Sequence, residues 1–184
     1  STIGNITVRN HTALTLVLNY IDMRSINENN AHVYGNDSST IAIVNDLASD
    51  VVFGGNVYAG TVDISWKDSS KKGSVRVNGD YTIEANQFIV KNADTIDVPK
   101  LRINTYADRN SRIDVTVKND LTLNVTTYAD DSENRVIVNA VSEEGNVNLH
   151  LNGEYTKKPK AENNFMTLTV LIDEIVGKNV SLVC

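Results

Sequence analysis

The residues best suited to chemistry in this chain lie in a tetrapeptide that occurs twice. Thr-Tyr-Ala-Asp appears at two places 22 residues apart and contributes Tyr106, Asp108, Tyr128 and Asp130. If consecutive coils of a repeating fold stacked at this offset, Tyr106 would lie against Tyr128. Asp108 would then lie near Asp130. Stacked tyrosines present a flat surface to a sugar ring or a partner protein, so we take these four residues as a candidate binding surface.

The paired aspartates have other potential uses. Two carboxylates on adjacent coils could coordinate Ca²⁺, or act as general acid and base on a polysaccharide. Solvated turns and cross-strand aromatic packing use the same residue types more often. The three histidines, His11, His32 and His150, are isolated in the sequence, and no nucleophile or zinc-binding motif is found. The sequence therefore predicts no catalytic residue, no metal ligand and no cofactor.

The charge balance and the cysteine count exclude several classes of protein. Lys and Arg number 17 and Asp and Glu 23, which gives a net charge of -6. Without a basic stripe to displace counterions, we expect no nucleic-acid partner and no binding to an anionic membrane surface. No apolar run approaches the roughly 20 residues that span a bilayer. A single cysteine, Cys184, cannot form an internal disulfide.

Short strands are predicted from end to end, so the fold class is all-β. Val, Ile and Thr supply 54 of the 184 residues, and their branched side chains fit a pleated surface. Apolar residues alternate with polar ones in many short runs, and 24 asparagines suit tight turns between them. No convincing amphipathic helix is found. The clearest alternating runs lie at 14–18, 62–64, 113–117, 121–125, 147–151 and 166–170.

Two arrangements of these strands are consistent with the pattern. The 22-residue echo favours a right-handed parallel β-helix, a single solenoid domain over residues 1–184 with roughly eight coils of about 22 residues. Two Asn-Gly pairs, Asn78-Gly79 and Asn152-Gly153, are typical of two-residue hairpin turns and favour an antiparallel β-sandwich instead. We expect the solenoid and keep the sandwich as the alternative.

Several segments share a pattern of glycine or asparagine, aspartate, and apolar-Thr-apolar triplets. They read GNITVRN at 4–10, LVLNYID at 16–22, IAIVND at 41–46, GDYTI at 79–83 and NDLTL at 119–123. This pattern resembles the coils of filamentous-haemagglutinin-like exoproteins and adhesins of bacterial two-partner secretion. The resemblance implies an internal segment of a long β-helical stalk. Such a stalk passes unfolded through an outer-membrane transporter and folds outside the cell.

These observations favour a non-catalytic structural and binding role on the cell surface or after secretion. The expected partner is a protein or glycan of a host or bacterial surface, in addition to the transporter. Two alternatives stay open, a polysaccharide-active β-helix lyase or hydrolase and a compact carbohydrate-binding sandwich. Because solenoids need capping repeats and no cap is apparent at either end, we also expect end-to-end self-association.

Overall fold

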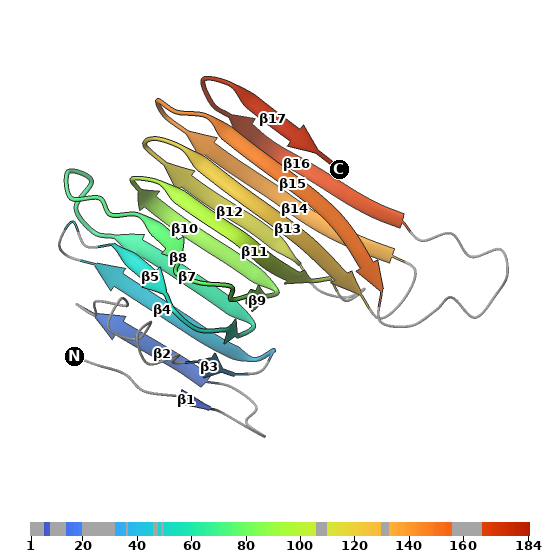
Figure 1. Cartoon of the computed structure of the whole chain (residues 1–184), viewed down its shortest axis with the longest axis horizontal. Helices are drawn as coiled ribbons and strands as arrows, with labels where there is room; N and C mark the ends of the chain where they lie inside the picture. Colours follow the sequence, from blue (N-terminus) through green and yellow to red (C-terminus); the bar gives the residue numbers. More distant parts are fainter. Residues whose placement is uncertain are drawn as a thin grey trace, which may run out of the picture.

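The computed structural model is a parallel β-solenoid built from two long sheets (Figure 1). It describes residues 6–7, 14–19, 32–35, 37–45, 48, 50–105, 110–129, 133–155 and 167–184. Every strand pairing within these ranges is parallel, and none of the described residues is helical. The prediction of an all-β parallel solenoid is confirmed, and the antiparallel sandwich is wrong. The right-handed winding stays a prediction.

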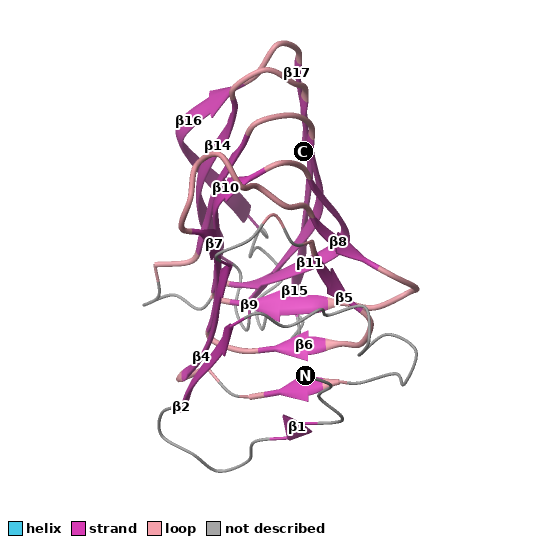
Figure 2. Cartoon of the chain, turned by 90° about the vertical axis from the view of Figure 1, so that its left-hand side faces the viewer, coloured by secondary structure: helices cyan, strands magenta, loops and turns pink. Residues whose placement is uncertain are grey.

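The chain alternates between the two sheets, which face each other across the core (Figure 2). Sheet A has the path β1 (Ile6–Thr7), β3 (Val33–Tyr34), β6 (Val57–Tyr58), β9 (Ile83–Ala85), β11 (Ile96–Asn104), β13 (Leu121–Ala129), β15 (Val147–Tyr155) and β17 (Val180–Val183). Two short strands, β5 (Val51–Phe53) and β8 (Val75–Val77), extend it beside β11. Sheet B has the path β2 (Leu14–Asn19), β4 (Ser39–Asn45), β7 (Thr61–Trp66), β10 (Gln87–Ala93), β12 (Arg112–Val117), β14 (Glu133–Ser142) and β16 (Thr167–Val176).

The Asn-Gly pairs do not form the hairpins that the sandwich required. Gly79 has a φ of 101°, a left-handed value that glycine adopts without steric cost, but it joins β8 to β9, which both pair in parallel with β11. Asn152 and Gly153 lie inside β15, where they pair with Thr126 and Thr127 of β13. A dipeptide that favours a tight turn is thus used once as a bend and once as strand.

The predicted count of eight coils differs from the structure, because the coils are neither uniform nor as short as the tetrapeptide echo implied. Only about four turns are regular, and they carry β7, β10, β12 and β14. In these turns Thr61 pairs with Gln87, and Gln87 pairs with Arg112. These steps are slightly longer than the offset between the two tetrapeptides. Elsewhere the step is shorter, as between Ile83 and Leu101, or much longer, as between β14 and β16.

The core consists of apolar columns that run along the solenoid, one residue from each coil. In sheet A one column joins the buried residues Val33, Val57, Ile83, Leu101, Val125 and Leu151. In sheet B a buried column joins Ile41, Val62, Phe88, Ile113 and Val138. Alternate residues of each strand point outward, which is why the period-2 pattern identified the strands.

Asparagine side chains satisfy backbone groups where the chain turns between sheets. Asn86 is buried at such a corner, and its Nδ2 donates to the Asn104 carbonyl at 2.8 Å and to Ser111 Oγ at 3.0 Å. The Ser111 hydroxyl in turn donates to the same Asn104 carbonyl at 2.6 Å. Asn92 shows a second use of the residue, because its φ of 63° lies where the register of β10 shifts between Val90 and Ala93.

A charged cluster lies on the outer face of sheet B around Asp114. Asp114 accepts hydrogen bonds from Lys91 Nζ and from Asn139 Nδ2. Burial raises the pKa of Asp114, but these two hydrogen bonds and the charges of Lys91 and Arg112 outweigh it, so the pKa lies below 3.8. Burial raises the pKa of nearby Asp63, where the Lys91 charge offsets the burial only in part.

We predict that Asp114→Asn lowers the free energy of unfolding by about 1 kcal/mol at pH 7. Because the folded pKa of Asp114 lies below its unfolded value, this contribution is present above the unfolded pKa and is lost as pH falls through the folded one. Asp63→Asn is the matched control, and it should leave stability unchanged or raise it, because the charge it removes is disfavoured by burial. Urea unfolding of the two variants at pH 7 measures the difference, and equal losses would contradict the assignment.

Candidate functional site

The outer face of sheet A carries one continuous row of large polar and aromatic side chains. The row takes one residue from each of six successive strands: Tyr34, Tyr58, Glu84, Arg102, Thr126 and Asn152. Each of them lies next in sequence to a buried apolar residue of the core column, which directs the row outward. At the parallel spacing of about 4.8 Å the row extends about 24 Å along the solenoid. We call these six residues the outer row.

The first part of the outer row is aromatic. The rings of Tyr34 and His32 are stacked, with centroids 5.7 Å apart and an interplanar angle of 17°. Tyr81 meets His32 edge-on at 5.7 Å and 74°. The Tyr58 hydroxyl donates a 2.7 Å hydrogen bond to Asp37 Oδ1, which fixes the end of that side chain. Tyr34 is 38% exposed, so part of this aromatic surface is open to a ligand.

His32 is held in place by the backbone of the next coil. Its Nδ1 accepts a 2.8 Å hydrogen bond from the Asn56 amide, and Asn56 Oδ1 accepts one from the Thr82 amide at 2.9 Å. These bonds join three coils at the point where the chain enters β3, β6 and β9. The ring therefore has a set orientation.

The middle of the outer row is an ion pair with an aromatic neighbour. Arg102 Nε lies 3.2 Å from Glu84 Oε1, and the Arg102 guanidinium lies 4.0 Å from the centre of the Tyr128 ring. Tyr128 comes from β13, in the outward position next but one to Thr126. Side chains of Arg102 and Glu84 are 34% and 24% exposed. The guanidinium is thus pre-positioned, with one side on an aromatic ring and the carboxylate at its edge.

The surroundings of Glu84 raise the pKa of its carboxyl group. Burial raises the pKa of the Glu84 carboxyl above 4.5, the Arg102 charge lowers it in part, and the Asp37 charge raises it further. The net shift is upward. Glu84 is therefore easier to protonate than an exposed glutamate, a property that both proton donation to a ligand and acid catalysis use.

A shallow hollow adjoins the ion pair on the same face. It has a volume of about 410 Å³. Its lining residues are Thr82, Pro99, Lys100, Leu101, Arg102, Asn124, Thr126 and Glu154. Hydroxyl, amide, guanidinium, ammonium and carboxylate groups thus line the hollow together with Pro99 and Leu101. A polyhydroxylated molecule could use the hydrogen-bonding groups, while its less polar faces contact Pro99.

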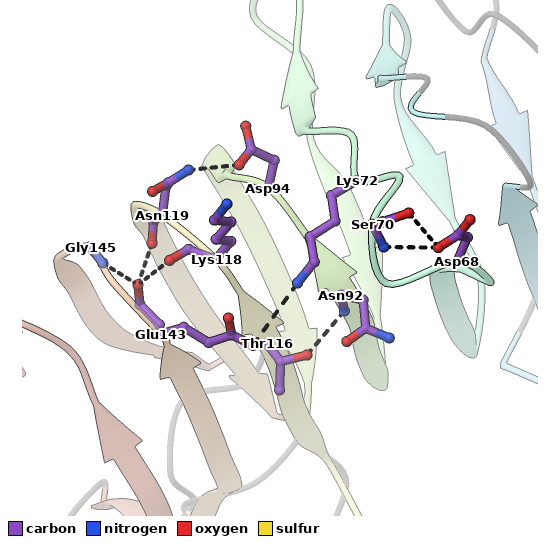
Figure 3. A network of polar contacts seen from close by, with 11 residues as sticks. Asp68, Ser70, Lys72, Asn92, Asp94, Thr116, Lys118, Asn119, Glu143 and Gly145 are labelled. Atoms are coloured by element: carbon purple, nitrogen blue, oxygen red, sulfur yellow. Dashed lines mark hydrogen bonds and ion pairs between the residues drawn. The ribbon is translucent and has the colours of Figure 1, made fainter.

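A second hollow of about 650 Å³ lies at a turn between the sheets (Figure 3). Its charged lining residues are Lys72, Asp94, Lys118 and Glu143. The Lys72 side chain is only 14% exposed and its Nζ lies 4.0 Å from Glu143 Oε1. Asn119 Nδ2 donates to Asp94 Oδ1 at 2.7 Å. Two cations and two carboxylates balance in this hollow, and its lining lacks the aromatic surface of the outer row.

The structure describes one of the four residues that the sequence singled out for binding. Tyr128 lies on the outer face of sheet A beside Arg102, whereas Tyr106, Asp108 and Asp130 lie outside the described residues. The register pairs Tyr128 with Asn104, so the step between coils is longer here than the tetrapeptide echo implied. The candidate surface made from all four residues stays a prediction.

Sequence reasoning missed the outer row because its members share no motif. They differ in type, and the spacing from one member to the next changes along the row, as the strand pairings set it. The available signal was a polar or aromatic residue directly after a core valine, isoleucine or leucine in each strand. Without the register, however, nothing aligns these residues across coils.

Among the described residues no group of three or more His, Cys, Asp or Glu side chains is placed to hold a metal ion. In the same part of the chain no helix is long and apolar enough to cross a membrane.

Comparisons with known proteins identify no relative for this chain. No family model, no curated protein and no solved structure matches it. The geometry of the outer row is therefore the basis on which function is inferred.

We predict that Glu84→Gln gains stability relative to the parent chain as the pH is raised from 4 to 7. Because the folded pKa of Glu84 lies above its unfolded value, its contribution to stability is full below the unfolded pKa and is lost as pH rises through the folded pKa. Glutamine has no such dependence. Melting temperatures at pH 4, 5.5 and 7 measure the trend, and Asp114→Asn should move in the opposite sense. A difference that stays constant with pH would refute the shift.

Proposed function

We propose that the outer row of sheet A is a carbohydrate-binding surface on a structural solenoid and that the chain acts by binding. The observation that carries the proposal is the juxtaposition of Tyr58, Glu84, Arg102 and Tyr128 along one exposed face beside the 410 Å³ hollow. An extended row suits an extended ligand, and a glycan chain is extended, polyhydroxylated and partly apolar on its ring faces.

The residue types in the outer row match what glycan recognition needs. Tyrosine rings provide flat area at small entropic cost, since only two side-chain torsions must be fixed. Thr126, Asn152 and Asn124 supply donors and acceptors for hydroxyl groups. The charges of Arg102 and Glu84 are already paired, so a neutral or weakly acidic glycan is favoured over a polyanion.

The wider biological role that we infer is a segment of a secreted or surface-exposed adhesin or exoprotein. It is supported by the parallel solenoid, a fold compatible with a stalk, and by the resemblance of the coil pattern to filamentous-haemagglutinin-like exoproteins. In this proposal the chain binds a glycan on a host or bacterial surface, and it interacts with the outer-membrane transporter during secretion. The stalk positions the outer row away from the cell, where it meets the glycan.

We predict that Tyr128→Ala weakens glycan binding about tenfold, which corresponds to about 1.4 kcal/mol. Tyr128→Phe keeps the ring and should bind nearly as the parent chain does. Arg102→Ala should weaken binding to a similar extent, while Arg135→Ala, an exposed arginine on sheet B, is the matched control and should have no effect. A glycan array identifies the ligand and titration calorimetry measures the affinities. Failure of the parent chain to bind any glycan would overturn the proposal.

Glycan cleavage is the second candidate, and the raised pKa of Glu84 is the observation that favours it. A glutamate with a raised pKa keeps its proton to higher pH and can donate it to a glycosidic oxygen. Asp37 lies close enough to influence this carboxyl and is anchored by Tyr58. In this scheme the two carboxyl groups would divide the acid and base roles.

Glu84→Gln separates the two candidates. If the chain only binds glycans, neither the parent nor the variant releases reducing ends from a bound polysaccharide. If the chain cleaves them, the parent does so and the variant loses about a hundredfold or more in rate while still binding. Reducing-end assays on the glycans identified by the array, with and without Ca²⁺, decide between the outcomes.

A further inference from the structure

Four consecutive coils build the hollow of about 650 Å³ at the turns between the sheets (Figure 3). Each of these coils contributes one charged side chain, from the turn that follows its strand in sheet B. The four side chains are Lys72 after β7, Asp94 after β10, Lys118 after β12 and Glu143 after β14. They are far apart in the sequence, and the stacking of the coils brings them together around one hollow.

Backbone hydrogen bonds between neighbouring coils hold these turns in place. The Asp94 amide donates to the carbonyl of Gly73, directly after Lys72, at 2.7 Å. Further along the solenoid, the Glu144 amide donates to the Lys118 carbonyl at 2.8 Å. The charged side chains therefore extend from fixed backbone positions, which reduces the ordering that a ligand must impose when it binds.

Lys72 has a mostly buried side chain whose ammonium group lacks a hydrogen bond to any described residue. The side chain is 14% exposed, and Nζ lies 4.0 Å from Glu143 Oε1. That distance exceeds the roughly 3.2 Å over which an N–H group donates to an oxygen. An ammonium group that has lost much of its water is costly unless other acceptors replace that water. The arrangement therefore favours an acceptor in the hollow beside Lys72.

The four charges of the hollow balance in number but not in exposure. The Glu143 side chain is 62% exposed, so water screens its charge more than that of the mostly buried Lys72. Asp94 Oδ1 already accepts a 2.7 Å hydrogen bond from Asn119 Nδ2. Lys118 is exposed, and its ammonium group is joined to no other described residue by a hydrogen bond or ion pair. The two lysines therefore keep more unused binding capacity than the two carboxylates.

We propose that this hollow binds a phosphate or sulfate group between Lys72 and Lys118. An ammonium group binds such anions as a point charge with several N–H donors. A tetrahedral anion offers acceptor oxygens on more than one side, so lysines of different coils contact it together. The site is separate from the outer row, because its hollow shares no lining residue with the one beside Arg102.

The loop before Lys72 supplies a further donor and a matched control. The Ser70 hydroxyl and amide both donate to Asp68 Oδ1, at 2.7 Å and 2.9 Å, so neither is left for a ligand. Ser69 also lines the hollow, and its hydroxyl has no such bond to a described residue. Lys71 has a 51% exposed side chain paired with Asp68 at 4.0 Å, and it does not line the hollow.

Titration calorimetry of the whole chain with inorganic phosphate and with sulfate, at low ionic strength, tests the proposal. The parent chain should bind both anions saturably. Lys72→Gln and, independently, Lys118→Gln should each weaken binding about tenfold, because each removes a charge-assisted contact with the anion. Lys71→Gln is the matched control and should bind like the parent. Circular dichroism checks that each variant is folded, and if Lys72→Gln does not fold, Lys118→Gln takes its place.

Glu143→Gln tests the electrostatic argument in the opposite sense. Removal of this carboxylate releases Lys72 from its ion pair, so the anion should bind about threefold more tightly. Tyr128→Ala alters the outer row and should leave phosphate binding unchanged, which keeps this site distinct from glycan binding on sheet A.

A hexose phosphate, compared with inorganic phosphate and with the free hexose, identifies the source of the anion. Tighter binding of the hexose phosphate supports the site and assigns it a phosphorylated sugar, while equal or weaker binding supports it as a site for the free anion. The proposal is overturned if the parent chain binds neither phosphate nor sulfate saturably. It is also overturned if Lys71→Gln weakens binding as much as Lys72→Gln, or if Glu143→Gln leaves binding unchanged or weaker.

Discussion

The structure depends on one repeated contact, the parallel stacking of each coil on the one before it. Backbone hydrogen bonds join the strands, and inward side chains meet their counterparts in columns such as Val57, Ile83 and Leu101. Neither part is sufficient alone, because an isolated parallel strand has no partner and an isolated coil cannot bury its inner face. Each added coil therefore contributes both buried apolar surface and backbone hydrogen bonds. The other features of the molecule depend on this stacking.

The same stacking brings the polar and aromatic residues of the outer row together on one face of sheet A. Tyr58, Glu84 and Arg102 are far apart in the sequence, but the ladder places them on neighbouring strands about 4.8 Å apart. Their electrostatics follows from that proximity, since burial and the neighbouring Asp37 raise the pKa of Glu84 while Arg102 opposes the shift. On sheet B, burial raises the pKa of Asp114, but two hydrogen bonds and two neighbouring positive charges together lower it below its usual value, whereas at Asp63 burial outweighs the Lys91 charge and the pKa is raised. Position in a row, more than residue type, decides how each carboxylate behaves.

Turns between the sheets and register shifts within strands together absorb the differences in coil length. The coil step is short between β9 and β11 and long between β14 and β16, yet inward residues pair with inward residues on both sides of each shift. Buried polar corners such as Asn86 with Ser111 make this possible, since a side-chain amide replaces a lost backbone partner. Asn56 and Asn119 likewise make side-chain hydrogen bonds near the ends of strands.

The all-β class and the short strands could be predicted from the amino-acid sequence, because inward and outward residues alternate in most strands. The sequence favoured stacked coils over a sandwich only through the repeated tetrapeptide. It did not determine the coil length, since the matching tetrapeptides implied a shorter step than the one that pairs Tyr128 with Asn104. It also did not identify the outer row, because that row depends on which residue of one coil lies above which residue of the next. That alignment is set by the lengths and corner contacts of the turns, and these are visible only in the folded chain.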